Sequence, residues 1–240
     1  NSLLQRVNDL RATLRQLDEM NDSGEMNTKR QFAAQLDLEK IGVMGRSFGG
    51  TTTLAALALE PRFTAGVAVV PLVMPDFRSG FPAEFLKPVG QESVILAAQG
   101  APALHTLSKP TMLLSGAEDG LIIGIGAAMA ETMGGEKPSV TNPLPPLRKA
   151  YQQSNQAVFW GLLENSNHSS FGVSGGYWWP QYKGKTQQRF FAHEQQFELI
   201  SPAIAHQVQA QKVLQFFDVM ISGDQTSSEL LKGNQFEQQG

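Results

Sequence analysis

The sequence predicts an α/β fold with a mostly parallel sheet and flanking helices. Two observations support this fold class. Short apolar runs typical of buried strands recur along the chain, and segments with helical periodicity or composition separate them. A chain of 240 residues with 41% hydrophobic and 17% charged side chains is long enough and apolar enough to bury one core. We therefore expect a single domain over residues 1–240.

Helices are expected in four places. Apolar side chains recur every three or four positions over residues 3–20, which is typical of an amphipathic helix. The run 51–59 is rich in Ala and Leu and favours a second helix, which Pro61 ends. Two further helices are expected near residues 124–133 and 202–221.

Four short apolar runs predict strands. They cover residues 40–45, 65–70, 111–115 and 157–162. The near-continuous apolar character of AGVAVV at 65–70 is typical of a parallel strand that is covered on both faces. Because these strands alternate with the helices, we expect them to lie parallel.

Two stretches are expected to be insertions in this core, near residues 71–110 and 172–199. Prolines at 143, 145 and 146 predict a loop before the last strand.

The composition excludes several classes of function. The net charge of −3 and the scattered basic residues give no nucleic-acid surface, and no apolar run is long enough for a membrane span. With 0 cysteines there is no disulfide, thiolate metal site or cysteine nucleophile. The many glutamines and the lack of cysteine favour an exported or periplasmic bacterial protein, although the compartment itself is not identified.

Residues 45–49 (GRSFG) fit the pattern Gly-x-Ser-x-Gly. A predicted strand ends at Gly45 and a predicted helix follows Ser47, so the serine would lie on a sharp strand-to-helix turn. The flanking glycines avoid clashes in such a turn. The hydroxyl would then project at the positive end of the helix, with the backbone N–H of Phe48 as an oxyanion donor. The motif therefore predicts that Ser47 is a nucleophile.

Two other interpretations of this motif are open. A phosphate-binding loop would place a lysine before the hydroxyl residue that follows the glycines, whereas Thr51 and Thr52 directly follow Gly50. A plain glycine-rich turn is the second alternative.

A serine nucleophile needs a base, which in this arrangement follows the acid in the chain. His105 precedes the predicted acid, and His193 and His206 lie late, in a polar loop and on the last helix. His168 lies in a short loop directly after the strand at 157–162, where it can reach across the strand ends. We therefore expect His168 to be the base, with a surface or packed imidazole as the alternative.

The acid is expected after the strand at 111–115. Glu118 and Asp119 both lie in the turn that follows this strand. The spacing of Asp119 from Gly116 favours Asp119 as the group that orients the imidazole, with Glu118 facing elsewhere. A solvated turn is the alternative for both carboxylates.

These segments together resemble the α/β-hydrolase superfamily, and within it the platelet-activating-factor acetylhydrolase-like and dienelactone-hydrolase-like enzymes. The resemblance covers most of the chain outside the two insertions. It is carried by residues 38–50 (LEKIGVMGRSFGG), 60–67 (EPRFTAGV), His168 with Phe171, and 215–224 with Leu230 and Leu231, which resemble the terminal helix of bacterial members.

The resemblance implies a serine esterase, lipase-like in type. Its substrate would be a small-molecule or lipid-like ester, cleaved through an acyl-enzyme on Ser47 with His168 and Asp119, with no metal or organic cofactor. A peptidase or amidase with the same residues, and a non-catalytic binding protein of this fold, remain open. Residues 72–74 and 177–179 either line an acyl pocket or pack an insertion on the core.

The sequence departs from the family pattern at three points. Arg46 stands where His is common, and Val70 stands where the plasma acetylhydrolase has its acid, which leaves Asp119 for that role. Complete members also place several strands and an oxyanion His-Gly motif before the serine. We therefore expect those N-terminal strands to be absent from this chain, and an N-terminal segment or second chain to complete the sheet.

Overall fold

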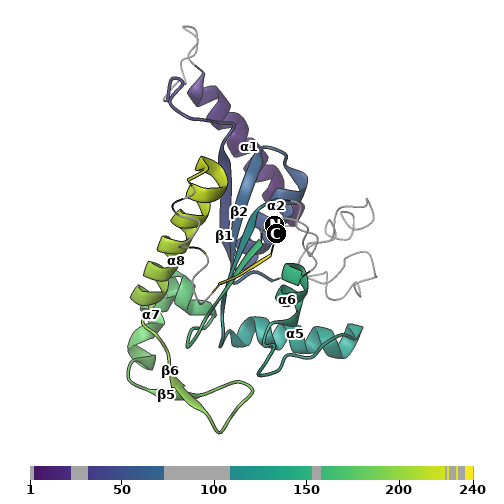
Figure 1. Cartoon of the computed structure of the whole chain (residues 1–240), viewed down its shortest axis with the longest axis vertical. Coiled ribbons are helices and arrows are strands. Elements are labelled where there is room, and N and C mark those ends of the chain that lie inside the picture. Colours follow the sequence, from purple (N-terminus) through teal and green to yellow (C-terminus); the bar gives the residue numbers. More distant parts are fainter. Residues whose placement is uncertain are drawn as a thin grey trace.

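The fold is a five-stranded sheet covered by helices on both faces (Figure 1). The computed structural model describes residues 3–22, 32–72, 109–152, 158–224, 226, 231 and 236–239.

The sheet is parallel except at one edge. Strands β1 (Ile41–Arg46), β2 (Phe63–Val69), β3 (Thr111–Gly116) and β4 (Val158–Leu163) lie side by side in chain order and are parallel. Strand β7 (Phe236–Gln239) pairs with β4 in the antiparallel direction. The predicted α/β class with a mostly parallel sheet is confirmed, whereas no sequence pattern indicated β7.

Helices cover the two faces unequally. The helices α1 (Leu3–Asn21), α2 (Phe48–Leu59), α5 (Gly120–Met133) and α6 (Pro145–Gln152) contribute to one apolar cluster. Helix α8 (Pro202–Phe217) contributes to the other. Figure 1 shows α8 on one side of the sheet and α2 and α6 on the opposite side.

Strand β4 shows how the strands fill both clusters. Val158 and Trp160 point into the cluster with α6, where the rings of Trp160 and Tyr151 lie 6.0 Å apart. Phe159 points to the other face and meets the ring of Phe216 on α8 edge-on, with centroids 5.8 Å apart. Because successive side chains alternate between two covered faces, a continuous apolar run is needed, as the sequence indicated.

The loop predicted from the prolines before β4 is confirmed at Pro143 and wrong at the other two prolines. Pro145 and Pro146 instead begin α6, which extends to Gln152. Proline fits the first turn of a helix because its missing N–H would have no acceptor there. The last helix also ends differently, since α8 continues into one π-helical turn, η3 (Asp218–Ser222).

The two expected insertions differ in how much of them is described. Residues 73–108 of the first lie outside the described residues. The second contains helix α7 (Val173–Tyr182) and a hairpin of β5 (Thr186–Gln188) and β6 (Gln196–Glu198), none of which the sequence predicted.

Strand β1 lies at one edge of the described sheet. An N-terminal segment or chain that pairs with this edge stays a prediction. Among the helices of the described ranges, none has both the length and the apolar character to cross a bilayer.

Candidate active site

Ser47 lies between β1 and α2 in a strained backbone conformation. Its φ is 56° and its ψ is −123°, in the left-handed half of backbone space that non-glycine residues avoid. The N–H of Ser47 donates to the carbonyl oxygen of Val69 at 2.8 Å, and the N–H of Thr51 donates to the carbonyl of Ser47 at 3.1 Å. The surrounding backbone thus holds the turn in place, as the motif predicted.

The glycines around Ser47 are not equally required. A Cβ on Gly45 would lie 2.2 Å from the carbonyl oxygen of Gly49, so no side chain fits there. A Cβ on Gly50 would lie 3.1 Å from the carbonyl oxygen of Val69. A Cβ on Gly49 itself would meet no heavy atom of the described residues within 4 Å. The expected steric need therefore holds for Gly45 and not for Gly49.

The structure brings Ser47, His168 and Asp119 together in one line of hydrogen bonds. The Oγ of Ser47 lies 2.9 Å from Nε2 of His168, and Nδ1 of His168 lies 2.8 Å from Oδ2 of Asp119. The three residues follow the carboxyl ends of β1, β4 and β3, which meet at one edge of the sheet. The side chain of Asp119 is 1% exposed and that of His168 is 16% exposed. The imidazole can therefore accept a proton from Ser47 while a buried carboxylate holds its other nitrogen.

The start of α5 fixes the Asp119 carboxylate. Its Oδ1 accepts a hydrogen bond from the N–H of Ile122 at 3.1 Å, so both of its oxygens are used. This contact caps α5, whose positive end also stabilises the negative charge.

Glu118 points away from the imidazole. Its carboxylate forms an ion pair with Arg189, on the segment after β5, and accepts a 3.5 Å hydrogen bond from the N–H of Phe190. Arg189 also donates to Oδ1 of Asn165 at 3.0 Å. The structure thus separates the two candidate acids and places Asp119 at the histidine.

Residues that the sequence analysis missed hold the histidine loop. The side chain of Asn167 accepts hydrogen bonds from the N–H groups of Ser169 and Ser170, at 3.0 and 3.2 Å, and so caps the short 3₁₀ turn η2 (His168–Phe171). The hydroxyl of Ser170 accepts a hydrogen bond from the N–H of Asn167 at 3.1 Å. An asparagine followed three positions later by a serine was the available sequence signal.

Arg46, the last residue of β1, also contacts this loop. Its Nη2 donates to the carbonyl oxygen of His168 at 2.6 Å. Burial lowers the pKa of the Arg46 guanidinium below its usual value, and the nearby Asp119 carboxylate opposes this effect. The guanidinium therefore carries its charge in a partly desolvated position beside the Ser47–His168–Asp119 line.

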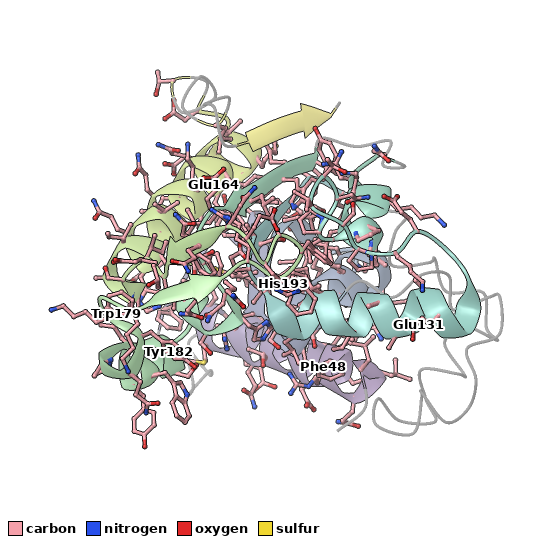
Figure 2. The ribbon with its side chains drawn as sticks, turned by 90° about the horizontal axis from the view of Figure 1, so that it is seen from below. Phe48, Glu131, Glu164, Trp179, Tyr182 and His193 are labelled. Atoms are coloured by element: carbon pink, nitrogen blue, oxygen red, sulfur yellow. The ribbon has the colours of Figure 1, made fainter. Side chains whose placement is uncertain are left out.

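The other histidines lie elsewhere. His193, labelled in Figure 2, is exposed in the turn between β5 and β6. His206 is exposed on α8. His105 lies outside the described residues. Of the histidines that the structure describes, the one placed at Ser47 is His168.

The chain resembles a known esterase in structure. A ferulic acid esterase from Streptomyces cinnamoneus superposes on 99% of this chain with a TM-score of 0.56 and 18% sequence identity. The chain has the α/β-hydrolase fold. It spans only 55% of the length of that esterase.

Sequence comparison adds a second hydrolase. The family model for the prolyl oligopeptidase family matches residues 26–123 of this α/β-hydrolase chain, a segment that includes Ser47 and Asp119. No curated protein matches the chain in sequence. Both matches are to hydrolytic enzymes. The closer resemblance to acetylhydrolase-like or dienelactone-hydrolase-like enzymes stays a prediction.

Phe48 begins α2, so its N–H lies in the first turn and has no acceptor within the helix, and its role as an oxyanion donor stays a prediction. The guanidinium carbon of Arg6 lies 4.8 Å above the Phe48 ring. This cation–π contact joins α1 to the start of α2.

The aromatic residues of α7 lie beside the histidine loop. Trp178, Trp179 and Tyr182 line a hollow of about 200 Å³ together with Asn167 and Ser169. Figure 2 shows Trp179 and Tyr182 at one side of this end of the molecule and Glu131 of α5 at the other, with Phe48 between them. Of the predicted acyl-pocket residues, 73 and 74 lie outside the described residues.

Proposed function

We propose that this chain hydrolyses carboxylic esters through an acyl-enzyme on Ser47. The observation that carries the proposal is the continuous line from Ser47 Oγ through the His168 ring to the Asp119 carboxylate, with distances of 2.9 and 2.8 Å. A serine hydroxyl is a weak nucleophile until a base removes its proton, and this arrangement supplies the base together with its orienting acid.

In the first half of the proposed reaction, Ser47 Oγ attacks the ester carbonyl carbon and its proton passes to Nε2 of His168. Asp119 keeps the neutral ring in the tautomer with hydrogen on Nδ1 and stabilises the cation that forms. The negative oxygen of the tetrahedral intermediate accepts a hydrogen bond from the N–H of Phe48 at the positive end of α2. When the intermediate collapses, the C–O bond to the alcohol breaks and Nε2–H protonates the leaving alcohol.

In the second half, a water molecule replaces the alcohol. His168 removes a proton from this water as it attacks the acyl carbon, and the proton then returns to Ser47 Oγ as the acid product leaves. Each proton that His168 accepts is given back, so the cycle regenerates the starting state with no other reactant.

The similarity to a ferulic acid esterase supports esters as the substrate class. The match to the prolyl oligopeptidase family favours a second candidate, a peptidase with the same catalytic residues. The two candidates differ in the leaving group. A peptidase releases an amine, which must be protonated before it can leave, whereas an esterase releases an alcohol, which leaves more easily.

Steady-state kinetics test the proposal. Wild-type protein should hydrolyse p-nitrophenyl acetate, and either Ser47→Ala or His168→Ala should reduce kcat by about 10⁴-fold or more. The matched control is His206→Ala, which removes an exposed imidazole on α8 and should leave kcat unchanged.

Peptide p-nitroanilides separate the two candidates. Faster cleavage of the anilides than of the esters would replace the esterase by the peptidase. Ester turnover that survives both active-site substitutions would contradict the proposal. No turnover of either substrate by folded protein would favour a non-catalytic binding protein of this fold.

A further inference from the structure

Arg46 connects the nucleophile to the base through a route separate from the Ser47–His168 hydrogen bond. It precedes Ser47 directly in the chain, and its side chain leaves the end of β1 toward the histidine loop. Its Nη2 donates to the carbonyl oxygen of His168 at 2.6 Å, a short distance for a hydrogen bond from a charged donor.

The same guanidinium lies against the other end of the histidine turn. Gly172 directly follows η2 as its C-cap, and a Cβ built there would lie 2.7 Å from both Cζ and Nε of Arg46. Only a glycine lets the guanidinium approach this closely. Arg46 thus contacts the turn at His168, where it begins, and at Gly172, directly after its last residue.

These contacts close a ring. The backbone links Ser47 to Arg46, the Arg46 side chain binds the main chain of His168, and the His168 side chain binds the Ser47 hydroxyl. Ser166, two residues before His168, packs closely on the end of β3, since a Cβ on Gly116 would lie 2.6 Å from the carbonyl oxygen of Ser166. The loop is thereby held between the ends of β1 and β3.

Arg46 makes no ion pair with a carboxylate among the described residues, and its buried Nε has no hydrogen-bond partner there. A partly buried guanidinium loses hydration, so a role that stabilised only the fold would favour an apolar side chain at this position. The position of Arg46 is therefore explained better by its contacts with the histidine loop than by a contribution to the free energy of folding.

We propose that Arg46 is a positioning residue that fixes the His168 ring at hydrogen-bonding distance from Ser47. The inference rests on the proposed function, since it concerns the geometry of that reaction. A displacement of about 1 Å at a reacting group can lower a rate on the order of 100-fold, so loss of one such brace should lower kcat.

The test compares Arg46→Met, Arg46→Lys and Arg46→Ala in p-nitrophenyl acetate hydrolysis. Arg46→Met should lower kcat about 10- to 100-fold with little change in KM, because substrate binding is untouched. The kcat of Arg46→Lys should fall between those of wild type and Arg46→Met, since an ammonium can still donate to the His168 carbonyl but lacks the planar group that lies close to Gly172. Arg62→Met, which removes a guanidinium paired with Asp18 before β2, is the matched control and should retain wild-type kcat.

Chemical rescue separates positioning from folding. Ethylguanidinium replaces the atoms that Arg46→Ala deletes and should restore part of kcat, whereas propylammonium at equal concentration should not. This readout works on whatever fraction of the variant folds, so it does not depend on full stability.

The experiment distinguishes failure of the Arg46 proposal from failure of the proposed function. If wild-type protein does not hydrolyse esters, the proposed function fails and the positioning role fails with it. If wild-type protein is active and the Arg46 variants keep kcat within about twofold, only the positioning role fails. A raised KM with unchanged kcat would also overturn it, because Arg46 would then bind substrate. Equal rescue by both additives would contradict the guanidinium geometry.

Discussion

The backbone strain at Ser47 can be measured by replacing the residue with glycine and with alanine. Both variants lose the hydroxyl and its hydrogen bond to His168, so their difference isolates the Cβ at φ 56° and ψ −123°. Strain of this kind costs about 1–3 kcal/mol, and glycine relieves it. Glycine also loses about 0.5–1 kcal/mol through the greater freedom of its unfolded chain. We therefore expect Ser47→Gly to be about 1 kcal/mol more stable than Ser47→Ala.

Urea denaturation followed by circular dichroism measures this difference from the two midpoints, provided that the m-values agree. For a protein of this size, 1 kcal/mol corresponds to about 2–4 °C in Tm. Ser115 in β3 is the matched control because its φ is negative, so glycine there should be less stable than alanine. If Ser47→Ala were as stable as Ser47→Gly or more stable, the strain inferred from the backbone angles would be refuted.

Four further substitutions have expected outcomes. In an ester assay, Asp119→Asn should lower kcat about 10³- to 10⁴-fold because the carboxylate no longer holds the His168 ring. Glu118→Gln should leave kcat nearly unchanged, since Glu118 pairs with Arg189. Equal losses of kcat in the two variants would contradict the assignment of Asp119 as the acid. Gly45→Ala should destabilise the fold by about 3 kcal/mol or more in urea, since its Cβ would overlap the Gly49 carbonyl, and a wild-type midpoint would disprove that contact. Phe216→Ala should cost about 3–5 kcal/mol, because this fully buried ring packs on Phe159, and a loss below 1 kcal/mol would contradict it.

Much of the fold could be predicted from periodicity because burial determines it. Strand β2 lies between two strands and two layers of helices, so every position of residues 65–70 must be apolar, and the pattern is unambiguous. The same holds for α1, whose one buried stripe gives a helical repeat. Elements without a buried face left no such signal. Strand β5 exposes two of its three residues, and α7 buries only Gly175, so neither pattern was visible.

The site was predictable where local chemistry requires a specific residue. The glycine at 45 has no substitute in the turn, and the strand ends place Asp119 and His168 at one sheet edge. The contact of Arg46 with the carbonyl of His168 joins residues 122 positions apart, and an arginine side chain can reach many partners. Such long-range side-chain contacts leave no periodicity in the sequence, so only the structure could show this one.

The nature of the nucleophile is tested most directly by a fluorophosphonate, which reacts with activated serines. We expect the intact mass of the wild-type protein to rise by one phosphonyl group per chain, and peptide mapping to place the adduct on Ser47. The Ser47→Ala variant should remain unmodified, and His168→Ala should react far more slowly. An adduct on any other residue, or a Ser47→Ala variant labelled as fast as wild type, would contradict the assignment of Ser47.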